Sequence, residues 1–276
     1  MIMQKSQLGR TSSFIRKGET HHHTEIIYYI KINNFMPSTI EYYEVETMEL
    51  ELISFDVWNT LLDLKTVFNA LADEVARPKD EKINGIKIIN EVYRELKDVR
   101  RLGSIADDKF LLYSQEELAK KLNINRDILL SILIRVFSRL NSDLVVIEDA
   151  VEVLREVKKM GLKIGIIGNV MFWPSTLTRL LLEKTGIAKY IDKQLYSDEY
   201  GLSKPDRRIF IKLCRDLNVK AENAMHVGDS LAEDVGGALS AGMRAVWINP
   251  SAKKIVNIAN KIYVISRLRE LLNIII

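Results

Sequence analysis

The chain has 276 residues, a formal net charge of +3 at pH 7 and a single cysteine, Cys214. This length is enough for one large α/β domain, or for a core domain with a smaller insertion, but a third domain would be crowded. Basic and acidic residues nearly balance, so the sequence lacks the concentrated basic stripe of a nucleic-acid-binding protein. One cysteine excludes an internal disulfide framework and favours a reducing cytoplasm.

Hydropathy argues against a membrane protein. No apolar run approaches the roughly 18 to 20 residues that a bilayer-spanning helix needs, and the basic N-terminus lacks the apolar stretch of a signal peptide. We therefore predict a soluble cytoplasmic protein without nucleic-acid or membrane partners. Its oligomeric state cannot be predicted from these features.

Residues 1–47 differ in character from the rest of the chain. Residues 1–23 are polar and basic without periodicity, which is typical of a disordered arm or of sequence upstream of the true start, with Met48 as an alternative start. Three adjacent histidines, His21 to His23, would bind divalent ions only loosely there. Residues 27–36 have β propensity and predict an edge strand if the arm is part of the protein.

The first predicted core element is a short strand that ends at Asp56. The apolar run over 50–55 suits a strand buried on both faces of a parallel sheet. Asp56 follows at its carboxyl end, where open α/β sheets bind their ligands. An aspartate in this place can also simply cap a turn, so its neighbours decide its role.

A helical insertion follows directly. Amphipathic patterns predict helices over 66–77, 86–102, 114–123 and 126–140, and the capping-box pair Ser114 and Glu117 predicts that the third of them begins at Ser114. We assign residues 66–141 to a small helical cap domain and residues 48–65 and 142–276 to the core domain.

Strands and amphipathic helices alternate from residue 142 to the C-terminus. Strands are predicted over 162–169, near 193–196, over 223–229 and 244–250, and at the start of 261–274, with helices between them over 147–161, 174–186, 207–218 and 231–242. This alternation predicts an α/β fold with a doubly wound parallel sheet. Three polar stretches end at the same sheet edge as Asp56: Asn169, Lys204, and Asp229 with Asp234.

These stretches carry a family resemblance. In order, "FDVWNTLL", "IIGN", "GLSKPDRRIF" and "VGDSLAEDVGGALSAGM" resemble the four motifs of the haloacid dehalogenase superfamily, in the branch with a helical cap after the first motif. The resemblance runs from about Met48 to the C-terminus. It implies a Rossmann-like core and a hydrolase that uses an aspartate nucleophile.

The resemblance also implies roles for individual residues. Asp56 is the expected nucleophile and forms an aspartyl intermediate. Mg²⁺ is the expected cofactor, with the Asp56 carboxylate, the Trp58 backbone carbonyl and Asp229 as ligands. Asp234 is expected to orient a metal-bound water or Lys204 from behind these ligands.

The substrate phosphate is expected to meet neutral and cationic donors. Lys204 is a point charge suited to a phosphoryl oxygen, and Asn169 with backbone amides near Gly168 supplies uncharged donors. We interpret Phe172 and Trp173 as packing residues and His226 as a core histidine.

Trp58 departs from the family pattern. Phosphatases of this superfamily carry a second aspartate two residues after the nucleophile, which protonates the leaving oxygen and later activates water. An indole donates one hydrogen bond and does not titrate, so Trp58 can do neither. General acid-base help of this kind is worth roughly 100- to 10,000-fold in rate.

Three functions remain open. We favour a magnesium-dependent phosphatase of small phosphorylated metabolites whose leaving groups need no proton. A 2-haloacid dehalogenase-like hydrolase is the alternative, because an aromatic residue replaces the second aspartate there; its substrate-binding arginine would be one of Arg77, Arg94, Arg100 and Arg101. The third is a weakly active or non-catalytic binding protein, with Trp58 filling the substrate space.

Overall fold

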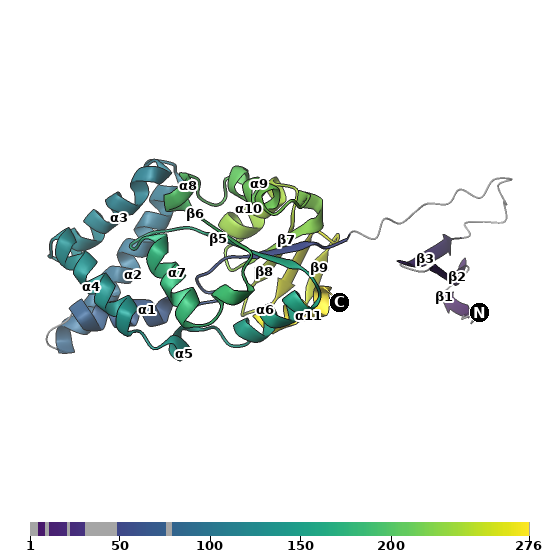
Figure 1. Cartoon of the computed structure of the whole chain (residues 1–276), viewed down its shortest axis with the longest axis horizontal. Coiled ribbons are helices and arrows are strands. Elements are labelled where there is room, and N and C mark those ends of the chain that lie inside the picture. The colour runs from purple at the N-terminus through teal and green to yellow at the C-terminus, as the bar shows by residue number, and fades with distance from the viewer. Residues whose placement is uncertain (1–4, 9–10, 21–22, 31–48, 76–78, 276) are drawn as a thin grey trace. The chain divides into compact units, whose positions relative to one another are not determined.

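The computed structural model describes residues 5–8, 11–20, 23–30, 49–75 and 79–275 (Figure 1). The chain divides into two compact units, Met1–Glu49 and Leu50–Ile276. The described part of the first unit has three strands in an antiparallel sheet of order β1-β2-β3: β1 (Lys5–Leu8), β2 (Thr11–Thr20) and β3 (His23–Ile30). We predicted a strand here only over 27–36; β3 covers 27–30, and 31–36 lie outside the described residues, as do His21 and His22.

The second unit is built on a sheet of seven strands among the described residues, in the order β6-β5-β4-β7-β8-β10-β9. Neighbouring strands are parallel except β9, which is antiparallel to β10. The predicted parallel α/β fold is therefore confirmed, whereas β9 was not predicted. The strands are β4 (Leu52–Phe55), β5 (Lys163–Gly168), β6 (Lys193–Tyr196), β7 (Ala224–Gly228), β8 (Arg244–Ile248), β9 (Val256–Ile258) and β10 (Ile262–Ile265).

The first four helices after β4 form the helical cap, and Figure 1 shows them gathered at the end of this unit opposite to β9. We call them the cap helices: α1 (Leu64–Val75), α2 (Lys79–Arg101), α3 (Asp107–Lys121) and α4 (Arg126–Arg139). The core has further helices, some of a single turn: α5 (Ser142–Val145), α6 (Ala150–Lys159), α7 (Ser175–Lys184), η1 (Ala188–Tyr190), α8 (Ser197–Tyr200), α9 (Arg207–Asp216), η2 (Ala221–Asn223), the π-helix η3 (Leu231–Gly236), α10 (Gly237–Ser240), η4 (Leu268–Leu271) and α11 (Leu272–Ile275).

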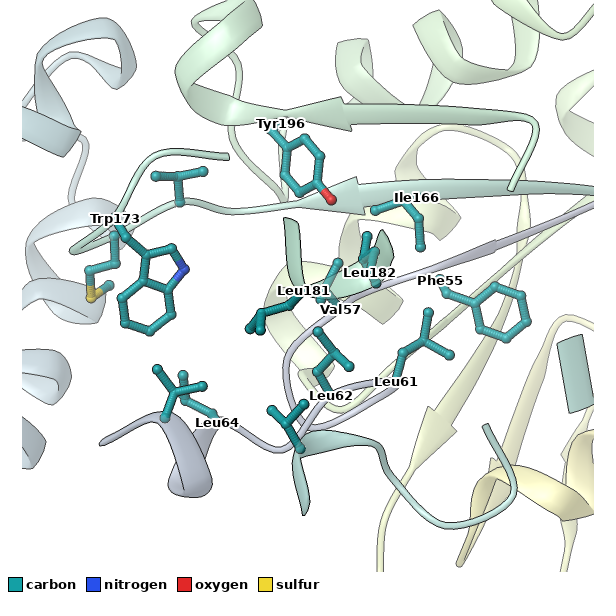
Figure 2. Close-up of a cluster of buried hydrophobic side chains, with 14 of the residues drawn as sticks. Phe55, Val57, Leu61, Leu62, Leu64, Ile166, Trp173, Leu181, Leu182 and Tyr196 are labelled. Carbon is teal, nitrogen blue, oxygen red and sulfur yellow. The ribbon is translucent and has the colours of Figure 1, made fainter. Parts of the chain in front are cut away.

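Both faces of the sheet are covered by helices. Alternate residues of a strand point to opposite sides of the sheet, so one strand contributes to a hydrophobic cluster on each face. Ile53 and Phe55 of β4 join a hydrophobic cluster with α6 and α7, whereas Leu52 joins a second cluster with α9 and α10. Figure 2 shows part of the first cluster, including Phe55 of β4, Val57 and Leu182 of α7. β4 is thus a central strand that carries Asp56 to the carboxyl edge.

The start of α3 differs from the prediction. The helix begins at Asp107, so the helix start predicted at Ser114 is wrong. Ser114 lies inside the helix, and its hydroxyl donates hydrogen bonds to the carbonyls of Leu111 and Met171. Gln115 donates to the Phe172 carbonyl at 3.1 Å. The capping pattern was misleading because its serine has tertiary partners, and these tie a cap helix to the loop after β5.

Across the described residues, the helices are all too short or too polar to pass through a bilayer. Cys214 is buried in the cluster that includes α9, as expected of an ordinary core thiol.

Candidate active site

A buried ion triad occupies the carboxyl edge of the sheet. Asp56 follows β4, and its backbone N–H donates to Val227 of β7 at 2.9 Å. Lys204 Nζ donates to Asp56 Oδ1 at 2.5 Å and to Asp234 Oδ1 at 2.7 Å. Asp56 is 8 % exposed, and Lys204 and Asp234 are each 1 % exposed. A lysine this deeply buried keeps its charge because two carboxylates surround it.

Asp234 is fixed from every side. Its Oδ1 also lies 3.2 Å from His226 Nε2, and its Oδ2 accepts a hydrogen bond from the Ser230 backbone N–H at 2.9 Å. The other ring nitrogen of His226 lies 2.8 Å from the Ser54 hydroxyl. His226 is fully buried, as predicted for a core histidine, and it also supports Asp234. A side chain at Gly228 would overlap the Asp234 carboxyl group, so this position requires glycine.

The third carboxylate, Asp229, is held by a residue that we did not predict. Asn59, which follows Trp58 and has a positive φ of 60°, donates from Nδ2 to Asp229 Oδ2 at 3.2 Å. The Asp229 carbonyl accepts from Trp247 Nε1 at 3.0 Å. One carboxylate oxygen from each of Asp56, Asp229 and Asp234 lies within 4.8 Å of the others. The cluster carries three carboxylates against the single ammonium of Lys204.

The pKa values reflect this imbalance. Burial raises the pKa of Asp56 to about 7; Asp234 and Asp229 add to the rise, whereas Lys204 opposes it. Burial and Asp234 likewise raise the pKa of Asp229. Burial works against the charge of Asp234, but Lys204 and His226 outweigh it and hold the Asp234 pKa well below its ordinary value. Lys204 therefore compensates Asp234 most fully, which leaves Asp56 and Asp229 in excess.

This donor set fits a divalent cation. Hard cations such as Mg²⁺ take carboxylate and carbonyl oxygens, and the cluster offers carboxylates at short range. Both Asp234 oxygens already accept hydrogen bonds from protein donors. Asp56 and Asp229 are therefore the ligands that the cluster offers to a cation, and Asp234 positions Lys204.

Asn169 does not point its amide freely into the site. Its Oδ1 accepts from the Lys204 backbone N–H at 2.8 Å, and its Nδ2 donates to the Lys204 carbonyl at 3.0 Å and to Glu233 Oε2 at 3.2 Å. The amide thus clamps the backbone of Lys204. Gly168 ends β5, and a Cβ there would come within 2.6 Å of the Tyr196 ring, so its glycine has a packing reason.

An aromatic wall faces the ion triad. The Trp58 ring meets Trp173 edge-on, with ring centroids 5.2 Å apart, and Trp173 packs against Phe137 at 5.1 Å. Trp58, Phe172 and Trp173 line the same pocket as Asp56 and Asp229. Phe172 and Trp173, interpreted as packing residues, are buried and also form part of the pocket lining.

The cap contributes the remaining wall. Tyr93, Lys97 and Arg100 of α2 line the pocket together with Glu233 of η3. Arg100 donates to the Val170 carbonyl, and its guanidinium lies 3.9 Å from the centroid of the Phe110 ring. Of the four cap arginines considered, Arg94 and Arg101 are exposed, Arg77 lies outside the described residues, and Arg100 alone of the three described lines the pocket.

Tyr93, Lys97 and Glu233 line the pocket and were missed from sequence although each left a signal, whereas Arg100 was considered only as the arginine of a dehalogenase. Tyr93, Lys97 and Arg100 are spaced i, i+4 and i+7, which is one face of a helix. Glu233 stands inside the stretch "GDSLAED" beside Asp234. Asp63, a conceivable proton donor by type, instead accepts from the Thr66 backbone N–H at 2.9 Å at the start of α1 and is absent from the pocket lining.

Comparisons with known proteins agree on the family. A family model described as haloacid dehalogenase-like hydrolase matches residues 50–242. Glyceraldehyde 3-phosphate phosphatase of Methanopyrus kandleri is 35 % identical over 103 residues, 36 % of this chain and 42 % of that protein. The chain thus aligns with less than half of the length of the first curated relatives that it matches.

Solved structures match over a longer range. The HAD phosphatase from Thermococcus onnurineus has a TM-score of 0.58 and 27 % identity, covering 82 % of this chain and 97 % of that chain. The 2-haloacid dehalogenase from Pseudomonas syringae pv. Tomato DC3000 has a TM-score of 0.53 and 21 % identity over 82 % and 97 % of the two chains. At that identity the second match concerns the fold alone.

Proposed function

Because the chain belongs to the haloacid dehalogenase-like hydrolases, we propose that it is a magnesium-dependent phosphatase of small phosphorylated metabolites, acting in the cytoplasm. The single observation that carries this proposal is the cluster of Asp56, Asp229 and Asp234 around one buried lysine. A dehalogenase nucleophile needs no cation beside it, whereas attack on an anionic phosphate requires opposing charge. Curated relatives named as phosphatases support the same choice.

In this proposal the Asp56 carboxylate attacks phosphorus. A bond forms between an Asp56 oxygen and phosphorus, the bond to the leaving oxygen breaks, and water then hydrolyses the acyl phosphate to release inorganic phosphate and restore Asp56. Lys204 stays fixed through Asp234 and the Asn169 clamp, so its charge is in place before the substrate arrives. Preorganised charge of this kind costs no rearrangement during the reaction.

A cation would be held by Asp56, Asp229 and the Trp58 carbonyl. Bound there, Mg²⁺ would favour the ionised form of Asp56 and offset the charge of the phosphate oxygens. Asn59 donates a hydrogen bond to Asp229 Oδ2, so one Asp229 oxygen has a protein donor and the other is assigned to the cation.

Trp58 restricts the leaving group in this proposal. The indole packs against Trp173 at the position where the family resemblance implies a proton donor, so the leaving oxygen receives no proton from this position. Substrates whose leaving group is acidic, such as aryl or acyl phosphates, are therefore favoured over simple alkyl phosphates.

The test measures phosphate release from para-nitrophenyl phosphate with Mg²⁺ and with a chelator, beside halide release from 2-chloropropionate. We expect magnesium-dependent phosphate release that falls at least about 1,000-fold in Asp56→Asn, because the amide is a poor nucleophile. The matched control is Asp63→Asn, the same change seven residues along at the start of α1, which is expected to keep wild-type rates.

Each other outcome excludes the proposal in a defined way. Halide release without metal would assign the chain to the dehalogenases instead. Silence in both assays, with a folded protein, would support a binding role in which Trp58 fills the substrate space.

A further inference from the structure

Two oppositely charged residues from different parts of the fold meet in the pocket. Lys97 lies on the cap helix α2, and Glu233 lies on η3 in the core. Lys97 Nζ and Glu233 Oε1 are 3.8 Å apart, an ion pair that is too long for a hydrogen bond. Both line the pocket that contains Asp56 and Asp229. The pair thus faces the place where a substrate would extend from its phosphate.

Glu233 has one oxygen fixed and one without a donor. The residue is 7 % exposed. Its Oε2 accepts a hydrogen bond from Asn169 Nδ2 at 3.2 Å, whereas its Oε1 is buried without any hydrogen-bond partner among the described residues. A buried carboxylate oxygen without a donor is costly and rare in folded proteins. Its place in the pocket wall indicates that a ligand supplies the missing donor.

Lys97 supplies the complementary half. Its side chain is 24 % exposed, and its Nζ lies over the Tyr93 ring, 5.8 Å from the ring centroid. An ammonium has donors to give and no acceptor, and a carboxylate has acceptors and no donor. A group that lies against both must therefore accept one hydrogen bond and donate another.

A hydroxyl group does both. We propose that Lys97 and Glu233 together bind a hydroxyl of the substrate, which donates to Glu233 Oε1 and accepts from Lys97 Nζ. A substrate ammonium cannot accept from Lys97, and a substrate carboxylate cannot donate to Glu233. This inference rests on the proposed phosphatase function and narrows its substrates to phosphorylated compounds that carry a hydroxyl group.

The experiment compares kcat/KM for glycerol 3-phosphate with that for propyl phosphate, which lacks the hydroxyls. Both are alkyl phosphates, so the disfavoured leaving group lowers both rates alike and does not affect their ratio. A site built around a hydroxyl discriminates strongly against the analogue that lacks it, and because Lys97 is partly exposed we expect a preference of about 100-fold. Glu233→Leu and Lys97→Met are each expected to reduce the preference to less than about tenfold. The double variant should fall no further than either single variant, because one hydroxyl contacts both partners.

Two further variants separate recognition from structural support. Glu233→Gln keeps an acceptor oxygen and is expected to retain part of the preference. Lys121→Met is the matched control: Lys121 and Glu95 form a pair of similar length, 3.7 Å, on the cap helices outside the pocket. It should keep the wild-type preference, and the thermal midpoint of each variant checks its fold.

The outcomes distinguish a failure of the hydroxyl site from a failure of the proposed phosphatase function. If wild type releases phosphate from both compounds without preference, or if Lys121→Met lowers the preference as much as Lys97→Met, the hydroxyl site is wrong and the phosphatase stands. If neither compound nor para-nitrophenyl phosphate releases phosphate, the phosphatase is wrong and the hydroxyl site falls with it.

Discussion

The core side and the aromatic side of the pocket are held together by different forces. On the core side, Lys204 donates hydrogen bonds to the carboxylates of Asp56 at 2.5 Å and Asp234 at 2.7 Å. On the aromatic side, Trp58 and Trp173 meet edge-on, with centroids 5.2 Å apart. Charge-assisted contacts fix direction and cost much to break when buried, whereas ring contacts are worth about 0.5 to 1.5 kcal/mol beyond area burial. The core side is therefore rigid, and the aromatic side is the part that substitution can reshape.

Removing the lysine should break the core side most severely. Lys204→Met leaves two buried carboxylates without their counter-charge, so we expect the free energy of unfolding to fall by about 3 to 5 kcal/mol. Urea unfolding in the presence of a chelator measures this loss without rescue by a cation.

The matched control is Lys158→Met. Lys158 also contacts a carboxylate, Asp192, at 2.8 Å, but about a third of each side chain (34 %) is exposed. Exposed pairs contribute about 0 to 1 kcal/mol. Equal losses in the two variants would contradict the view that burial makes the Lys204 contacts costly to lose.

The features that could be predicted from sequence are those that depend on local signals. The sheet followed from apolar runs, and Asp56, Lys204, Asp229 and Asp234 followed from motifs at strand ends, since both signals are local. Strand β9 was missed because it has only three residues, all exposed, and so leaves no apolar run.

Partner choice was harder to predict because it depends on tertiary contacts. Asn169 was expected to donate to a phosphate, but its amide binds the Lys204 backbone instead. The helix start at Ser114 failed for the same reason, since its hydroxyl bonds to the loop after β5. Lys97 and Glu233 come together only when the cap is folded over the core. No single segment of sequence specifies that arrangement, so the pair could not be predicted.

Gly228→Ala should disturb the core side with no change in charge. The added methyl overlaps the Asp234 carboxyl, and this group cannot move freely because Lys204 and His226 hold it. We expect a loss of about 1 to 3 kcal/mol in the free energy of unfolding, typical of overpacking. Weaker magnesium binding should accompany it, measured by titration calorimetry.

Gly85→Ala is the control for Gly228→Ala. Gly85 lies in α2, and an added methyl would meet the Ala72 Cβ at 3.7 Å, an ordinary contact. Alanine is favoured over glycine inside a helix, so this variant should gain about 0.5 to 1 kcal/mol. Opposite signs are expected for one and the same substitution, and a loss at both positions would argue against a specific role for the space at Gly228.

Trp58→Asp tests the aromatic side. The aspartate restores a group that can give and take a proton, so kcat/KM for alkyl phosphates should rise about tenfold over that of Trp58→Asn, while aryl phosphates gain little. Tenfold corresponds to about 1.4 kcal/mol in the barrier. It lies below the usual range for acid-base catalysis because the pocket around residue 58 is shaped by Trp173 and Phe172 rather than for a carboxylate.

The comparison with Trp58→Asn separates the effect of proton transfer from the effect of the space that the lost indole opens, because asparagine has the same size as aspartate and does not titrate. If the two variants turn over alkyl phosphates equally, the indole governs the width of the pocket and not the choice of leaving group. If both exceed wild type with alkyl and aryl phosphates alike, Trp58 restricts entry. Only a gain confined to aspartate and to alkyl phosphates supports the view that Trp58 replaces a proton donor.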